Sequence, residues 1–146
     1  KISMSNPSKV NILIVDDDDV AAESVVRSLR KHGMDFPITL ARDGMEALEI
    51  LRNQHNDLAI DKPYLILLDL NMPRMDGFEF LQEVRGDKNL HDSIIFVLTT
   101  SDADSDRTRA YHQNIAGYMV KSAVGPQFAK LANLLDNYRS TVSLPA

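Results

Sequence analysis

Three short apolar segments constrain the fold of this chain more than any other feature. They cover residues 11–15, 64–68 and 94–98, and each stops abruptly at polar residues. Continuous apolar runs of this length are typical of strands that are buried on both faces of a sheet. Sheets of that kind are parallel and carry helices on both faces, so the sequence favours an α/β fold.

Segments with helical spacing separate these strands. The first has apolar residues at i, i+3, i+4 and i+7 and a glycine stop, namely Ala22, Val25, Val26, Leu29 and Gly33. Similar spacing predicts further helices around residues 47–51, 78–84 and 128–135, and a weaker one over 102–113. Residues 37–41 and 116–120 are predicted as two more strands, and residues 53–62 as a polar loop.

Strands and helices thus alternate five times along the chain. Right-handed crossovers between parallel strands are the usual solution for such a pattern. We predict a doubly wound five-stranded parallel sheet of the flavodoxin-like (βα)5 type, with strand order 2-1-3-4-5. The length of 146 residues fits one domain, which we expect over residues 9–139. Residues 1–8 and 140–146 are expected to be tails, with Met4 as the natural start.

Charge and composition argue against several kinds of partner and site. The net charge is −5, whereas a general nucleic-acid binder usually carries a basic face. The chain has no cysteine, so disulfides and thiolate metal sites are ruled out. No apolar run reaches the roughly 18 residues of a membrane span, and no signal-peptide pattern is present. We therefore expect a cytoplasmic protein that binds neither nucleic acid nor membrane.

Chemically active side chains follow four of the predicted strands. The first strand ends at Asp16 and Asp17, the third at Asp69, the fourth at Thr99 and the fifth at Lys121. With the predicted strand order these four strands are neighbours, and ligands bind outside their carboxyl ends. We therefore expect the five side chains to converge on one edge of the sheet.

Such a cluster is suited to a divalent cation and a phosphoryl group. Neighbouring carboxylates repel one another unless a cation neutralises them or some are protonated. Oxygen ligands without histidine or cysteine suit Mg²⁺ or Mn²⁺. Lys121 offers a compact positive charge to a phosphoryl oxygen or to an unmodified aspartate, and Thr99 offers a hydroxyl donor. Because an aspartate can itself be phosphorylated, Asp69 is a candidate phosphoacceptor.

Four motifs at these strand ends resemble a known family. They are VDD at 15–17, LLDLNMPRMDG at 67–77, LTTS at 98–101 and GYMVKS at 117–122. In this order they make residues 9–138 similar to the receiver domain of two-component response regulators. The long loop at 53–62, the stretch 85–90 and the LTTS ending are similar to those of small stand-alone regulators paired with phytochrome-like or hybrid histidine kinases. The resemblance implies a signalling domain rather than an enzyme, one that promotes its own phosphorylation and dephosphorylation.

The resemblance implies a role for each matching residue of the site. Asp69 would accept a phosphoryl group from the phosphohistidine of a histidine kinase. Asp17 and Asp69 would bind Mg²⁺ through their carboxylates, Asp16 through water and Asn71 through its backbone carbonyl. Lys121 would contact a phosphoryl oxygen. Because we expect no output domain in this chain, signalling would proceed by contact with another protein, which the sequence does not identify.

The resemblance also implies a switch. Thr99 would turn its hydroxyl toward the phosphoryl group, Thr100 would shape access to the site, and Tyr118 would change its rotamer with Thr99. One position departs from the family. A proline usually follows the lysine there, and the peptide bond between the two is cis, whereas this chain has Ser122 after Lys121. A cis bond before any other residue costs about 3 kcal/mol, so whether the Lys121–Ser122 peptide is cis or trans is left open.

Some of these residues also have a simpler interpretation. Acidic residues at 16–19 would favour the start of a helix, and we expect Asp19 to be its cap and Asp18 to be a surface charge. Asp76 and Gly77 are predicted to form the turn into the third helix. The four histidines show no metal-ligand spacing, and we assign them no role.

Three rival functions are weighed against the receiver domain. A haloacid-dehalogenase-type phosphatase would need a carboxylate two residues after Asp69, where this chain has Asn71. A flavodoxin-like carrier is rejected, because four consecutive aspartates after the first strand would repel the phosphate of FMN. A pseudo-receiver, which binds partners without being phosphorylated, is the remaining alternative, although every residue needed for phosphorylation is present.

The last predicted helix raises the question of assembly. Leu134 and Tyr138 extend its apolar surface beyond the face that would meet the core. They would either support a symmetric homodimer or only cover the edge of the core, and both alternatives stand.

Overall fold

Strands and helices alternate along the chain as predicted. The computed structural model describes residues 10–121, 129–131 and 133. The strands are β1 (Asn11–Val15), β2 (Ile38–Ala41), β3 (Tyr64–Leu68), β4 (Ile94–Thr99) and β5 (Gly117–Val120). The helices are α1 (Asp19–Lys31), α2 (Gly44–Leu51), α3 (Gly77–Gly86) and α4 (Asp104–Tyr111). Residues 129–131 and 133 are helical too, and the rest of the predicted closing helix lies outside the described residues.

The strands form one parallel sheet in the order β2-β1-β3-β4-β5. The predicted doubly wound, flavodoxin-like topology is therefore confirmed. β1 and β3 end level, because Val15 pairs with Leu68, and β4 and β5 end level, because Thr99 pairs with Val120. Leu68 pairs with Val97, so the second pair of strands ends two residues further along. The residues that follow these positions leave the sheet along one edge.

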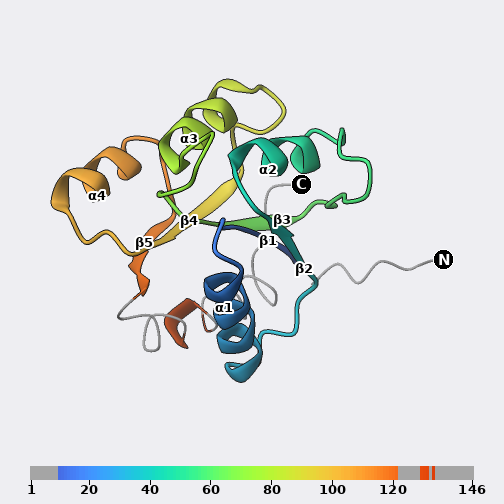
Figure 1. Ribbon diagram of the computed structural model, residues 1–146, viewed down its shortest axis with the longest axis vertical. Helices are drawn as coiled ribbons and strands as arrows, with labels where there is room; N and C mark the ends of the chain where they lie inside the picture. The colour runs from blue at the N-terminus through green and yellow to red at the C-terminus, as the bar shows by residue number, and fades with distance from the viewer. Residues whose placement is uncertain (1–9, 122–128, 132, 134–146) are drawn as a thin grey trace.

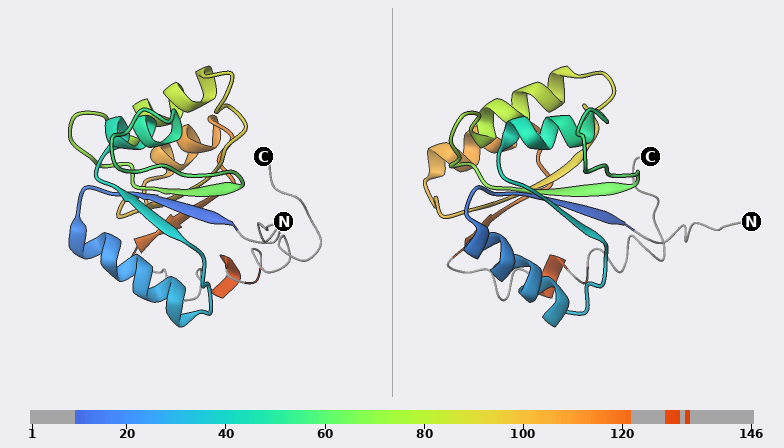
Figure 2. Two further views of the ribbon diagram at one scale, coloured as in Figure 1. Left: turned by 90° about the vertical axis from the view of Figure 1, so that its right-hand side faces the viewer. Right: turned by 45° about the vertical axis from the view of Figure 1, so that its right-hand side comes forward.

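Helices cover both faces of the sheet. Figures 1 and 2 show α2, α3 and α4 on one face, with α1 and the helical turn at 129–131 on the other. Alternate residues of β1 serve the two layers: Leu13 and Val15 pack in the α2–α3 cluster, whereas Ile12 and Ile14 pack with residues of α1. All of β3 is buried, as expected for a central parallel strand. Among the described residues, no helix is long and apolar enough to cross a membrane.

The start of α1 corrects one expectation. Asp18, rather than Asp19, is the N-cap, because its carboxylate accepts hydrogen bonds from the backbone N–H groups of Val20 and Ala21 at 3.0 and 3.2 Å. The extended backbone of Asp18 lets its side chain fold back onto the helix. Asp19 is the first helical residue, where its charge still favours the helix dipole.

The turn into α3 forms as predicted and is unusually close-packed. Asp76 caps the helix in a capping box with Glu79. The Gly77 N–H donates to the Leu70 carbonyl at 2.9 Å. A methyl group on Gly77 would lie 2.6 Å from the Cα of Leu70, so only glycine allows this approach. The β3–α3 loop is therefore closed at its base.

The predicted loop at 53–62 is held by a histidine to which the sequence assigned no role. Nδ1 of His55 accepts the backbone N–H groups of Asp57 and Leu58 at 3.0 and 2.9 Å. Its Nε2 lies 3.1 Å from a carboxylate oxygen of Glu46 on α2. His55 thus stabilises the loop and ties it to α2.

Candidate functional site

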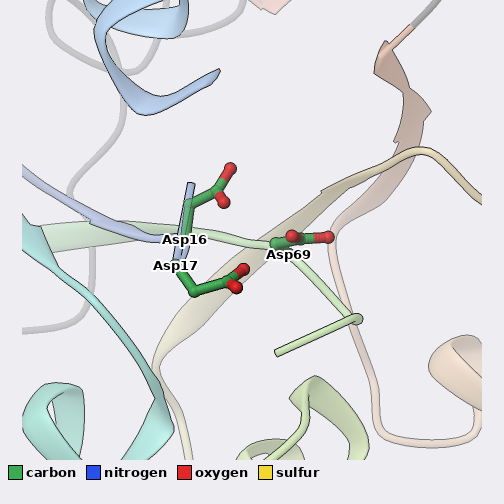
Figure 3. A group of neighbouring side chains, drawn as sticks. All are labelled: Asp16, Asp17 and Asp69. Carbon is green, nitrogen blue, oxygen red and sulfur yellow. The ribbon is translucent and has the colours of Figure 1, made fainter. Parts of the chain in front are cut away.

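Three carboxylates meet where β1 and β3 end. Oxygen atoms of Asp16, Asp17 and Asp69 all lie within 4.8 Å of one another, and Figure 3 shows the three side chains side by side. Asp16 and Asp69 are buried, at 5% and 7% exposure, while Asp17 is exposed. The cluster is therefore closed toward the protein and open toward solvent at Asp17.

The sheet itself positions the two buried aspartates. The backbone N–H of Asp69 donates to the Val15 carbonyl at 2.9 Å, and that of Asp16 donates to the Ala41 carbonyl at 3.0 Å. The backbone N–H of each residue therefore makes the last hydrogen bond between its strand and the neighbouring strand. Short turns then fix the side chains, because the Asp18 N–H donates to Asp16 at 3.0 Å and the Asn71 N–H donates to Asp69 at 3.3 Å.

Lys121 brings a positive charge from the end of β5. Its Nζ donates to Oδ2 of Asp16 at 2.8 Å and lies 3.7 Å from Oδ2 of Asp69. Burial acts to lower the pKa of Lys121, but the hydrogen bond to Asp16 and the charges of both aspartates outweigh it and raise the pKa. Lys121 is therefore charged at neutral pH and offsets part of the carboxylate repulsion.

Asp69 lies in an environment that disfavours its charge. Burial raises the pKa of Asp69, and the neighbouring charge of Asp16 raises it further. Lys121, the Asn71 N–H and the Thr99 hydroxyl act in the opposite direction without cancelling these effects. A cation placed among the carboxylates would favour the ionised form of Asp69.

The three switch candidates differ in environment. Thr99 ends β4 and is fully buried, whereas Thr100 is exposed. Tyr118 on β5 is half-buried, and its hydroxyl donates to the Ser101 carbonyl at 2.9 Å. The Ser101 N–H in turn donates to Oγ1 of Thr99 at 3.5 Å. Ser101 thus connects Thr99 to Tyr118, a link that the sequence did not predict.

The β4–α4 loop is also joined to its helix through Ser101. The N-cap position of α4, Ala103, has no side chain that caps the helix. Instead, Oγ of Ser101 accepts the Ala103 N–H at 3.3 Å and donates to Asp106 at 2.6 Å. The guanidinium of Arg107, on the same helix, lies 5.0 Å from the centre of the Tyr118 ring. Ser101 is therefore hydrogen-bonded to residues of β4, α4 and β5.

The site opens into a surface groove of about 530 Å³. Its wall includes Asp17 and Asn71 from the site, and Phe78 and Arg109 from α3 and α4. Of the three clustered aspartates, only Asp17 lines the groove, which lies beside the β3–α3 loop. The structure places the five side chains that were expected to converge at this edge of the sheet: Asp16, Asp17, Asp69, Thr99 and Lys121.

Comparison with known proteins decides the family. The family model described as the response regulator receiver domain matches residues 12–133. The chain belongs to this family. As a receiver domain it is a phosphoryl-accepting signalling domain of a two-component system, and it implies a histidine kinase or another phosphodonor as partner. Receiver domains bind a divalent metal at an acidic pocket, which the three aspartates form here.

Relatives of this receiver domain include single-domain regulators. It is 34% identical to the response regulator Rcp1 of Synechocystis sp., over 97% of either chain. It is 36% identical to the probable methanogenesis regulatory protein FilR2 of Methanothrix harundinacea, over 75% of this chain and 70% of that protein. The predicted family and fold are confirmed by these matches together with the topology.

Two solved structures are similar over nearly the whole chain. The Mn²⁺-bound form of the response regulator Rcp1 has a TM-score of 0.75 at 31% identity, covering 94% of this chain and 99% of that one. The phosphorylated cyanobacterial phytochrome response regulator RcpA has a TM-score of 0.74 at 29% identity, with the same coverage. The role of each site residue in this chain stays a prediction.

Proposed function

We propose that Asp69 is the phosphoacceptor and that Mg²⁺ assists it. Asp17 and Asp69 would bind the cation directly, Asp16 through water and Asn71 through its backbone carbonyl. The observation that carries the proposal is the position of Asp69, with two carboxylates and the ammonium group of Lys121 beside it. A cluster of three carboxylates and one lysine, with two of the carboxylates buried, is typical of functional sites that perturb pKa values, and a metal-assisted phosphoryl site is the one that fits these groups.

The donor set fits a hard divalent cation. It consists of oxygen atoms alone, and three ionised carboxylates with one lysine leave an excess of negative charge. Mn²⁺ prefers the same ligands and would substitute for Mg²⁺. When bound, the cation neutralises negative charge on the transferring phosphoryl group.

The protein's own residues would act as follows. A carboxylate oxygen of Asp69 attacks the phosphorus of the kinase's phosphohistidine, and the P–N bond breaks with its electron pair left on the imidazole nitrogen. The ammonium group of Lys121 moves from the carboxylates to a phosphoryl oxygen and neutralises the negative charge of that oxygen. The Thr99 hydroxyl donates to another phosphoryl oxygen. By accelerating this transfer and the later hydrolysis, the domain would promote its own phosphorylation and dephosphorylation.

We propose that Thr99, Thr100 and Tyr118 form the switch. Movement of Thr99 toward the phosphoryl group would withdraw its oxygen from the Ser101 N–H, and the Tyr118 hydroxyl would then lose its fixed partner on Ser101. Thr100, which is exposed, would limit access of water and donors. The Lys121–Ser122 peptide lies outside the described residues, so its isomer stays open.

The proposed partner is a phytochrome-like histidine kinase, which the likeness to phytochrome response regulators supports. Output would proceed by contact with a downstream protein in the cytoplasm. A homodimer through Leu134 and Tyr138 also stays a prediction, because both residues lie outside the described part of the chain. Sedimentation with and without beryllofluoride tests it, and a monomer in both conditions rejects it.

Intact-mass measurement tests the phosphoacceptor. With acetyl phosphate and Mg²⁺, the wild type should gain one phosphoryl group, and Asp69→Asn should gain none. Asp76→Asn is the matched control, since Asp76 caps α3 beside the site and asparagine is an equally good cap. No gain in the wild type, together with no Mg²⁺ binding, would favour the pseudo-receiver instead.

A further inference from the structure

The β3–α3 loop carries two of the proposed metal ligands, Asp69 and Asn71, but lies at the protein surface. Its base is closed by the Gly77–Leu70 hydrogen bond. Its tip, three residues beyond Asn71, is Arg74, which reaches a different element altogether. Nε of Arg74 donates to Oδ2 of Asp43 at 2.9 Å, and Nη2 donates to the same oxygen.

Asp43 is a firm anchor for this contact. It is only 7% exposed and is the N-cap of α2, where its other oxygen accepts the Glu46 N–H at 2.9 Å. Burial acts to raise the pKa of Asp43, but the hydrogen bonds from Glu46 and Arg74 outweigh it and hold the pKa below its usual value. Asp43 therefore holds the Glu46 backbone and the Arg74 guanidinium in fixed positions, because a charged carboxylate forms strong hydrogen bonds with each of them.

The backbone conformation of the loop at Arg74 also depends on its surroundings. Arg74 has a φ of +64°, a left-handed conformation that a non-glycine residue adopts only when its surroundings require it. The next residue, Met75, packs on the first turn of α2. A methyl group on Gly44 would lie 2.9 Å from Cγ and Sδ of Met75, so the missing side chain of Gly44 makes room for it. The loop therefore rests on α2 at two consecutive residues.

We propose that Arg74 and Asp43 are positioning residues of the metal centre: together they clamp the β3–α3 loop to α2 and so hold Asn71 and Asp69 in place for the cation. The inference rests on the proposed ligand set. Neither residue would touch the metal. Their effect would be to reduce the conformational freedom that the loop loses when the cation binds.

The sign of the effect separates the clamp from simple electrostatics. Arg74→Ala removes a positive charge near the carboxylates, which through space would strengthen cation binding. The clamp predicts the opposite, a weaker metal complex. Asp43→Asn breaks the same contact from the other side while asparagine keeps the N-cap of α2. Weaker binding in both variants, despite their opposite changes in charge, would be explained by the clamp alone.

Titration calorimetry of the whole chain with Mg²⁺ measures this effect. We expect each variant to bind Mg²⁺ about three- to tenfold more weakly, which is at or below the low end of the roughly 10–100-fold effect of groups that contact a metal ligand directly. The double variant should be no weaker than either single one, because both changes break one contact. Thermal unfolding in EDTA confirms folding and gives the stability of each variant without metal.

Arg52→Ala is the matched control. Arg52 lies at the other end of α2 and pairs with Asp87 and Glu83 at 3.1 and 3.4 Å, so its removal loosens α2 away from the site and also deletes one positive charge. Its Mg²⁺ affinity should be unchanged or slightly higher. If Arg74→Ala binds Mg²⁺ as tightly as Arg52→Ala, the clamp is refuted and the proposed ligands stand. If the wild type binds no Mg²⁺, the ligand assignment falls, and the clamp falls with it.

Discussion

Replacing Lys121 by methionine would leave two buried carboxylates without their cation. Coulomb's law with an effective dielectric constant of about 20 gives about 6 kcal/mol for the 2.8 Å contact with Asp16 and about 4.5 kcal/mol for the 3.7 Å contact with Asp69. Desolvation of the lysine offsets much of this, and removing one partner of a buried pair usually costs about 3–5 kcal/mol. Because the lysine side chain is still 19% exposed, we expect a loss near 3 kcal/mol.

Mg²⁺ should restore much of this loss. In the wild type, Lys121 competes with the cation for Asp16 and Asp69, so Lys121→Met should bind Mg²⁺ more tightly. A tenfold gain in affinity returns about 1.4 kcal/mol of stability relative to the wild type once Mg²⁺ is saturating.

Urea unfolding followed by circular dichroism, in EDTA and in excess Mg²⁺, measures both quantities. A loss below about 1 kcal/mol in EDTA would refute the electrostatic argument, since it is far less than a broken buried pair costs. An equal loss in both solutions would show that Lys121 and the cation do not share the same carboxylates.

Three further predictions concern stability. Without metal, Asp69→Asn should stabilise the domain at neutral pH. In the folded state the pKa of Asp69 is raised above its ordinary value of 3.8, so ionising this carboxyl at higher pH lowers the free energy of unfolding. The stability gain of Asp69→Asn should therefore vanish in unfolding measured below pH 3.8, where the carboxyl is protonated in both states. Gly77→Ala should cost about 2 kcal/mol in urea unfolding, because its methyl group would meet the Leu70 backbone at 2.6 Å; a neutral result would mean that the loop yields freely. Arg85→Met should cost about 2 kcal/mol, as Arg85 donates to four backbone carbonyls in two loops, and two of these bonds are partly buried; a loss no larger than that of Arg52→Ala would contradict this.

The fold could be predicted because its signals are local. The three apolar runs required buried strands, and the helical spacing between them required crossovers. The site followed from the same logic, since parallel strands bring their carboxyl ends to one edge whatever the loops do. Asp16, Asp69 and Lys121 could therefore be placed together without any knowledge of side-chain packing.

Contacts that depend on the path of a loop could not be predicted. Arg74 and Asp43 are 31 residues apart, and nothing in either segment reveals that the β3–α3 loop turns back over α2. The role of His55 depends in the same way on the course of its own loop. The cap of α1 was misplaced by one residue because four consecutive aspartates could each serve, and only the backbone angles at Asp18 decide between them.

The level ends of β1 and β3 constrain how the sequence of such a protein can evolve. Because Asp16 and Asp69 each follow directly on paired residues, Val15 and Leu68, adding one residue within a strand would turn the core side chains to the wrong face and displace an aspartate. Adding residues to the segment 53–62, between α2 and β3, would leave both undisturbed. Insertions and deletions should therefore be tolerated in connections that enter the strands at their amino ends, such as 53–62, and rejected in the strands and in the loops that carry the site. New partners could then be acquired through the first kind of loop while the chemistry is kept.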